Sequence, residues 1–227
     1  MQENNTQLEI TEQPDNQNVG PSVNTAIQTP AFADDVVFTH TKRVAKMMSM
    51  SDLVPENYRG EKNIPNVMIA LEMAHRIGAS PLQVMQNLYV VHGKPSWSSQ
   101  FIIASINSCG KFSPLRFDVD GEGDNLSCYA WAYDKATNDK LAGPKITMNM
   151  AKAEGWTTKN GSKWKTMPEL MIRYRAAAFF GRLYAPEIMM GMQSVEELHD
   201  IDTTEVAKSA AKNIQQVMAE KLNYDRQ

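Results

Sequence analysis

The strongest constraint in this sequence is a helix that is apolar on two sides. Residues Thr166 to Tyr184, "TMPELMIRYRAAAFFGRLY", fit one long helix with a capping box at Thr166 and Glu169 and an end before Pro186. Its apolar side chains recur at helical spacing in two stripes on opposite sides. Such a helix packs against other elements on both sides. Arg173 points away from the seam between the stripes and follows Glu169 by four residues, which predicts a local ion pair.

Two further arginines lie in the seam between the apolar stripes. Arg175 and Arg182 are seven residues apart and share almost the same azimuth. A partly buried guanidinium requires an anion, which is either a carboxylate from another element or a phosphate. Glu72 or Glu187 could supply the carboxylate. The helix alone slightly favours this structural ion pair.

The residues before the helix favour phosphate instead. In "TTKNGSKWKT", Lys159, Lys163 and Lys165 surround Trp164, and Trp156 precedes this polar loop. Lysines beside exposed tryptophans suit single-stranded nucleic acid, because ammonium groups pair with phosphates and indoles stack on bases. Tryptophan more commonly anchors a loop to the core, and both roles are compatible.

The charge is distributed unevenly along the chain, although the net charge is only −3. Residues 1–35 contain six acids and no Lys or Arg, and residues 187–227 contain eight acids against four bases. Between them, residues 140–186 carry nine bases against two acids. A basic block between acidic ends indicates an anionic partner, although a solvated charged face is the common alternative.

Composition and periodicity divide the chain into three parts. Residues 1–33 are polar and lack core-forming side chains, so we predict a disordered tail. Residues 34–201 form the folded domain, and residues 202–227 form a helical tail. The further helices are expected at Thr39–Asp52, Ile64–Ile77, from Pro81 after a capping box at Ser80 and Gln83, after Trp97, and near 194–200 and 203–222.

The strands are expected in two groups, which makes the fold class α+β. "NLYVVHGKPSW" predicts a hairpin that turns at Gly93. Alternating residues predict a three-strand antiparallel meander near 112–119, 126–134 and 140–148. The sequence therefore predicts a small antiparallel sheet packed with helices.

Several segments, in this order, resemble the RecT family of phage and prophage single-strand annealing proteins. They are "IGASPLQVMQNLYVVHGKPSWSSQFIIASINSCGKF", "YAWA", "MAKAEGW", "GSKWKTMPELMIRYRAAAFFGRLYAPE" and "GMQSVEEL". The resemblance covers roughly residues 38–201. Each segment is short, and their order and spacing together give the resemblance its specificity.

The resemblance implies binding of single-stranded DNA, ATP-independent annealing of complementary strands, and a core like that of other annealing proteins. It also implies homo-oligomeric rings or helical filaments on single-stranded DNA and annealed duplex, a phage exonuclease partner, and the cytoplasm of a bacterial host, where a host single-strand binding protein is a further expected partner. The expected DNA-binding residues, from the resemblance and from the lysine loop, are Lys94, Gln100, Lys159, Lys163, Trp164, Lys165, Arg175 and Arg182. No cofactor is expected, although Mg²⁺ could affect assembly.

Two other functions remain as alternatives. Asp118, Asp120, Glu122 and Asp124 resemble the start of a calcium loop, but Tyr129 stands where a bidentate Glu is required. A solvated acidic turn is the expected role of these acids, and a divalent-metal nuclease is the enzymatic alternative. The second alternative is a scaffold for replication or recombination proteins that does not anneal DNA.

Other chemistry has little support in the sequence. The GxxxxGK[ST] phosphate loop is absent, and the four histidines do not have metal-ligand spacing. Two cysteines fit a reducing compartment, and no apolar run approaches the length of a membrane span. We therefore expect no covalent catalysis, no metal site and no membrane partner.

Overall fold

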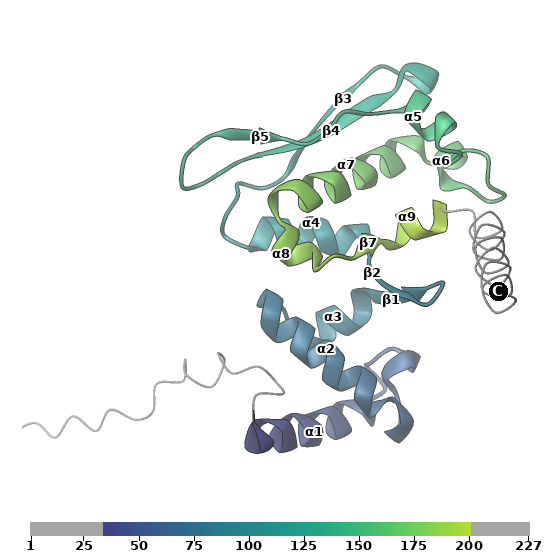
Figure 1. The fold of residues 1–227 in the computed structure, drawn as a ribbon. Coiled ribbons are helices and arrows are strands. Elements are labelled where there is room, and N and C mark those ends of the chain that lie inside the picture. The colour runs from purple at the N-terminus through teal and green to yellow at the C-terminus, as the bar shows by residue number, and fades with distance from the viewer. Residues whose placement is uncertain (1–33, 201–227) are drawn as a thin grey trace, which may run out of the picture.

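The computed structural model describes residues 34–200, and the expected tails at 1–33 and 202–227, including the helix expected near 203–222, lie outside this range. Its fold is α+β, with two small sheets packed against helices (Figure 1). The helices are α1 (Asp35–Ser49), α2 (Ile64–Ile77), α3 (Pro81–Asn87), α4 (Ser99–Ser108), α5 (Met148–Ala153), α6 (Lys163–Thr166), α7 (Pro168–Tyr184), α8 (Pro186–Met189) and α9 (Val195–Asp200), with short 3-10 turns η1 (Glu56–Tyr58), η2 (Glu61–Asn63) and η3 (Gly123–Asn125). The strands are β1 (Leu88–Val91), β2 (Lys94–Trp97), β3 (Arg116–Asp120), β4 (Ser127–Tyr133), β5 (Lys140–Ala142), β6 (Ile146–Thr147) and β7 (Gln193–Ser194).

The larger sheet is the predicted meander with one change. Strands β3, β4 and β5 pair antiparallel in chain order, and β6 also pairs with β4. The expected third strand is split into β5 and β6, because Gly143 and Pro144 interrupt it and proline cannot donate to a ladder. A Cβ added to Gly143 would lie 3.4 Å from the Phe180 Cα, so the sheet approaches α7 closely here.

The smaller sheet contains the predicted hairpin and one further strand. Strands β1 and β2 pair antiparallel, and β7 pairs parallel with β2. His92 and Gly93 turn the hairpin with φ of 51° and 76°, as a tight primed turn requires. The sheet is therefore mixed, whereas the sequence predicted only antiparallel pairing.

Helix α7 is the central layer of the larger part of the molecule, as its two apolar stripes predicted. It packs on β4 through one side and on α4 through the other (Figure 1). Phe180 meets Phe112 edge to face at a centroid distance of 5.7 Å, and a Cβ added to Gly181 would lie 3.0 Å from the Met189 Sδ. A side chain at Gly181 would therefore require the Met189 side chain to shift.

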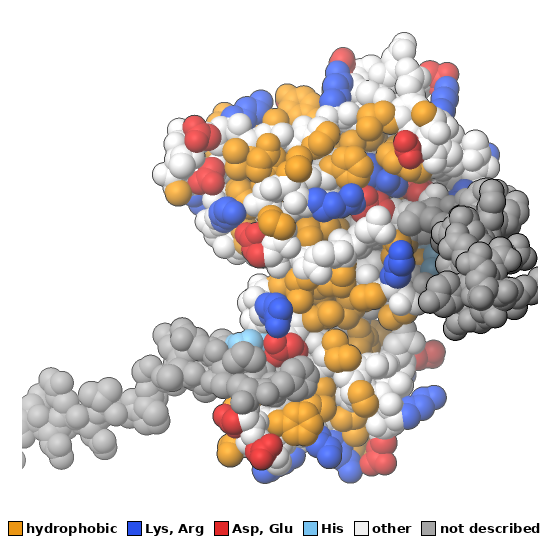
Figure 2. Space-filling model, in the orientation of Figure 1, with side chains coloured by type: hydrophobic (Ala, Val, Ile, Leu, Met, Phe, Trp, Pro, Cys, Tyr) orange, Lys and Arg blue, Asp and Glu red, His pale blue; other side chains and the backbone are white. Residues whose placement is uncertain are grey.

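The N-terminal helices form a second group joined to the rest through a narrow region. Helices α1, α2 and α3 pack on one another, and hydrophobic side chains gather where this group meets the larger part (Figure 2). Helix α2 has the predicted bounds and ends at Gly78, which adopts the left-handed conformation at φ 66°. None of the helices within residues 34–200 is both long and apolar enough to cross a membrane.

Two helix starts differ from the prediction. Helix α1 begins at Asp35 rather than Thr39, because the Asp34 side chain accepts a hydrogen bond from the Val37 N–H and caps it. Helix α7 begins at Pro168 rather than Thr166, and the expected capping box at Thr166 does not form. Met167 has φ −140° and ψ 56°, because a residue before proline is disfavoured in the helical region.

Candidate nucleic-acid interface

The guanidinium of Arg175 lies inside the protein between two carboxylates and an indole. Its side chain is 7% exposed, it pairs with Asp200, and it lies 3.8 Å from the Glu197 carboxylate. Its Cζ also lies 3.7 Å from the ring centroid of Trp156. Burial lowers the pKa of Arg175, but an arginine stays protonated at neutral pH. Of the two anions expected for Arg175, the structure therefore shows carboxylates, and the buried guanidinium is not placed to reach a phosphate.

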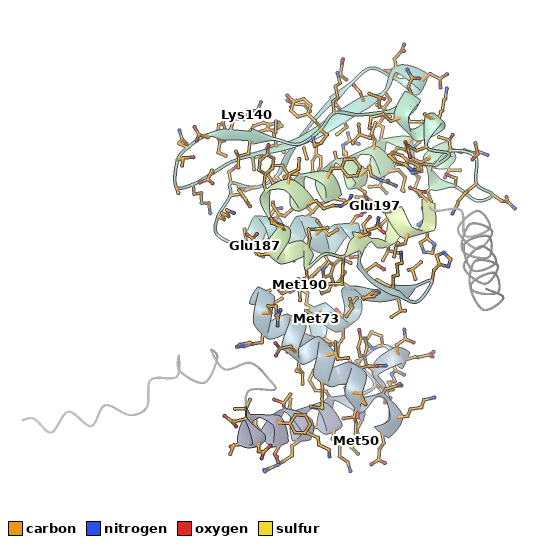
Figure 3. All side chains as sticks on the ribbon, viewed as in Figure 1. Met50, Met73, Lys140, Glu187, Met190 and Glu197 are labelled. Carbon is orange, nitrogen blue, oxygen red and sulfur yellow. The ribbon has the colours of Figure 1, made fainter. Side chains whose placement is uncertain are left out.

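Arg182 shares one of these carboxylates. It pairs with Glu197, whose side chain is 4% exposed, and its Cζ lies 4.8 Å from the centroid of Phe179. Its own side chain remains 37% exposed. Figure 3 shows Glu197 on α9 beside α7. Its carboxylate pairs with both Arg175 and Arg182.

The acids suggested by the sequence are engaged elsewhere. Glu72 pairs with Arg76, and Glu187 lies 3.5 Å from the Lys111 ammonium. Glu197 is positioned by a capping box at the start of α9, in which it accepts from the Ser194 N–H at 2.9 Å while Ser194 Oγ accepts from the Glu197 N–H. The "SVEE" sequence contains this Ser-x-x-Glu signal, which could have identified Glu197 as fixed in place.

Trp164 is an anchor for the lysine loop. It is 1% exposed, its indole N–H donates to Asp200 at 2.8 Å, and its ring centroid lies 5.2 Å from that of Trp156. Its ring therefore presents no open face for a base to stack on. The second expected role of the two tryptophans, anchoring the loop to the core, is the one that the geometry supports.

The three loop lysines differ in their surroundings. Lys163 and Lys165 are exposed on α6, and neither forms an ion pair within residues 34–200. Lys159 is partly buried and donates to the carbonyl of His199 at 2.5 Å. Lys163 and Lys165 are thus the loop cations best able to meet an anion.

Much of the basic block is neutralised within the protein. Among its nine basic residues, five pair with carboxylates, namely Lys145 with Asp120, Lys152 with Asp124, Arg173 with Glu169, Arg175 with Asp200 and Glu197, and Arg182 with Glu197. The expected Arg173–Glu169 pair is confirmed at 3.2 Å. A positive count along the chain therefore overstates the positive charge that this block presents to a ligand.

A groove of about 870 Å³ lies between the N-terminal helices and the hairpin. It is lined by η1, η2 and α2 on one side and by β1 and β2 on the other. Its apolar residues are Ile69, Met73, Leu88, Val90 and Pro95, and its polar residues are Glu56, Asn57, Tyr58, Arg59, Lys62, Asn63 and Asn66. The groove has apolar and amide side chains and two cations against one acid, Glu56, which suits a ligand with flat apolar rings and anionic groups.

The cations of this groove differ from those of α7. Arg59 donates to the carbonyls of Val54 at 2.7 Å and Asp52 at 2.6 Å, so it is held by neutral acceptors that leave its charge uncompensated. Lys62 is exposed and forms no ion pair within residues 34–200. The sequence predicted only a loop for this segment, since "ENYRGEKN" holds two cations, two amides and two acids and has no net charge.

The two hairpin-region residues predicted to bind DNA lie near this groove and beside α7. Lys94 is exposed at the start of β2, next to Pro95 in the groove wall. Gln100 is exposed on α4, and its side-chain N–H donates to the Tyr174 hydroxyl at 3.2 Å. Lys94 and Gln100 are therefore separate positions, one on the hairpin and the other tied to α7.

The acidic turn does not gather its carboxylates around one point. Asp118 accepts a hydrogen bond from Tyr129, Asp120 pairs with Lys145, and Asp124 pairs with Lys152 at 2.6 Å. Across residues 34–200, no group of three His, Cys, Asp or Glu residues could hold a metal ion.

Models of protein families, curated proteins and solved structures were compared with this chain, and none matches it. The functional argument therefore depends on the residues and on their geometry.

Proposed function

We propose that this chain binds single-stranded DNA and anneals complementary strands without ATP. The observation that carries the proposal is the groove between α2 and the β1–β2 hairpin, with its apolar lining and its unneutralised cations. The same function is supported by the short sequence segments that resemble the RecT family and follow one another in the same order. Single-stranded DNA offers both of the chemistries that this groove can accommodate, flat bases and a phosphate backbone.

Each part of the groove has a distinct role in this proposal. Bases lie against Ile69 and Val90, which are 50% and 68% exposed despite their apolar character. Phosphates meet Lys62 and Lys94, and Arg59 provides a fixed charge because its two carbonyl contacts limit its rotation. Since the contacts are to backbone and base faces, binding is independent of sequence.

The arginines of α7 act indirectly in this scheme. Arg175 and Arg182 hold α9 against α7 through Glu197 and Asp200, and Asp200 also receives the Trp164 N–H. The same cluster thereby fixes the loop that presents Lys163 and Lys165. These two lysines remain candidates for phosphate contact, whereas Arg175 and Trp164 serve the architecture.

Annealing in this proposal requires many copies of the chain on one strand. A single groove spans few nucleotides, so a stable register between two strands needs neighbouring copies that bind side by side, in a ring or a helical filament. The end of α1 offers apolar surface for such a contact, since Met47 and Met50 are 68% and 74% exposed (Figure 3). An exonuclease that generates single strands, and a host single-strand binding protein, are the partners that this activity calls for in the bacterial cytoplasm.

The test mixes the full-length protein with two complementary dye-labelled oligonucleotides in the absence of ATP. Rapid duplex formation above the spontaneous rate supports the proposal, and loss of that rate in a Lys62→Ala/Lys94→Ala variant locates it at the groove. A Lys42→Ala/Arg43→Ala variant, with the same charge change on exposed residues of α1, is the matched control. Strand cleavage with Mg²⁺ would indicate the nuclease instead. A protein that neither anneals nor cleaves DNA would support the second alternative, a scaffold for replication or recombination proteins.

A further inference from the structure

The larger sheet carries a row of aromatic side chains on the face opposite α7. Along β4, the buried residues Cys128, Ala130 and Ala132 alternate with Tyr129, Trp131 and Tyr133. Because alternate residues of a strand point to opposite faces, the three aromatic residues share the outer face. Within residues 34–200, α7 covers the inner face and no element packs over the outer one (Figure 1).

We propose that this outer face is a second site for single-stranded DNA, on which unpaired bases stack. The inference rests on the proposed annealing function and adds to it a strand-binding surface separate from the groove. Aromatic side chains displayed on a sheet are a general solution for holding unpaired bases, because every base has a face that can stack.

The arrangement of the rings supports stacking. Tyr133 is 42% exposed, and its ring meets that of Trp131 edge to face at 5.5 Å. The Tyr129 hydroxyl donates to Asp118 on the neighbouring strand β3, which fixes that ring and lowers the pKa of Asp118. The Asp118 carboxylate thus accepts a hydrogen bond from the Tyr129 hydroxyl on the same face of the sheet.

Two cations flank the aromatic row, one from each neighbouring strand. Arg116 on β3 lies directly opposite Trp131 in the register, and Lys140 on β5 lies opposite Tyr133. Figure 3 shows Lys140 at the edge of the sheet, and its ammonium lies 4.3 Å from the Trp131 centroid. Neither cation forms an ion pair within residues 34–200, although Asp118 on the same face attracts Lys140, so Arg116 has the less compensated charge to offer a phosphate.

Lys140 covers the face of Trp131 that a base would occupy. An exposed contact between a cation and an aromatic ring is weaker than the stacking of a base on the same ring. A base can therefore displace the ammonium, which then reaches the phosphate of the same nucleotide. Asp118 and Asp120 share this face of β3 with Arg116, and because Asp120 pairs with Lys145, Arg116 and Lys140 together exceed Asp118 by one positive charge.

Annealing gives this second surface a purpose. Bases stacked on the sheet keep their hydrogen-bonding edges directed outward, where a complementary strand can pair with them. A strand held only in the groove has its bases against the groove wall. The sheet face thus offers a place where strands are presented for pairing.

The experiment titrates the full-length protein with a thymidine 20-mer and follows tryptophan fluorescence and binding anisotropy together. Trp131 is the reporter, since Trp97, Trp156 and Trp164 are only 0%, 8% and 1% exposed. We expect quenching in the wild type, its loss in Trp131→Phe, and a weakening of affinity by about 5- to 100-fold in Trp131→Ala.

Tyr133→Ala is the second variant, because this more exposed ring can be removed with little effect on folding. Phe38→Ala on α1 is the control, since Phe38 is 41% exposed and lies in the other part of the molecule. We expect Tyr133→Ala to weaken binding and Phe38→Ala to leave it unchanged.

Three outcomes would overturn the inference. If the wild type binds the 20-mer and both Trp131→Ala and Tyr133→Ala bind equally well, the sheet face is not used and the groove alone remains. A wild type that does not bind DNA at all removes the proposed function together with this site. Concentration-dependent self-association that the Trp131 variants abolish without DNA would identify a second copy of the chain as the occupant.

Discussion

The cations of α7 and those of the groove illustrate how differently basic residues can be used in one chain. Arg175 meets Asp200 and Glu197 in the interior, and the partly exposed Arg182 shares Glu197. Arg59 is instead held by carbonyls, and Lys62 is exposed. The first set lies in the most basic stretch of the sequence and the second in a stretch of balanced charge. Charge that is available to a ligand thus depends on where the carboxylates fold, which a local count does not reveal.

The largest effect expected from this comparison is on stability. Arg175→Ala leaves the Asp200 carboxylate without its arginine, while Glu197 keeps its pair with Arg182, so we expect the free energy of unfolding to fall by about 3–5 kcal/mol. Urea unfolding followed by circular dichroism measures this change. A stable Arg175→Ala protein that has lost DNA binding would contradict the assignment and return this arginine to the phosphate role.

The sequence predicted the fold correctly where neighbouring residues determine the local structure. Gly78 ends α2 at the expected residue, and Gly93 turns the hairpin. Periodicity also placed α7 between two packed layers. These features depend on neighbouring residues or on a single repeat, so one sequence suffices to predict them.

The errors have a different origin, because each depends on competing or distant contacts. Pro168 overrode the capping pattern at Thr166, and Gly143 with the following proline divided the last meander strand. At the candidate site, the sequence indicated that Arg175 requires an anion, but it did not identify the two carboxylates that pair with it. Glu197 and Asp200 follow 22 and 25 residues later and reach α7 only through the tertiary fold.

Removal of the exposed cations at the groove should weaken DNA binding with little effect on folding. Removing Lys62 and Lys94 together should reduce the slope of log affinity against log salt by about 1.4, since each contacted phosphate of a single strand contributes about 0.7. Fluorescence anisotropy with a labelled oligonucleotide at several salt concentrations gives the slope. An unchanged slope in the double variant, with normal unfolding, would exclude these lysines from the DNA contact.

The lysine loop provides a smaller test, because it belongs to the neutralised block and yet presents exposed cations. Lys165→Ala should lower the same slope by about 0.7 if α6 reaches the strand. Lys152→Ala is the matched control, since that ammonium pairs with Asp124 at 2.6 Å. Equal slopes for Lys165→Ala and the wild type would confine phosphate contact to other parts of the protein.

The smallest effect is expected on the exposed side of α7, where Arg173 and Glu169 form a pair one helical turn apart. The Arg173 side chain is 35% exposed, so water and salt screen the pair, and Arg173→Ala should cost only about 0.3–0.5 kcal/mol. Salt then separates the two kinds of ion pair on one helix. In urea unfolding at about 1 M NaCl, where the screening length is roughly 3 Å, the cost of Arg173→Ala should vanish while that of Arg175→Ala persists. If both costs disappeared together, the Arg175 cluster would be open to solvent, and the contrast between buried and available charge would fail.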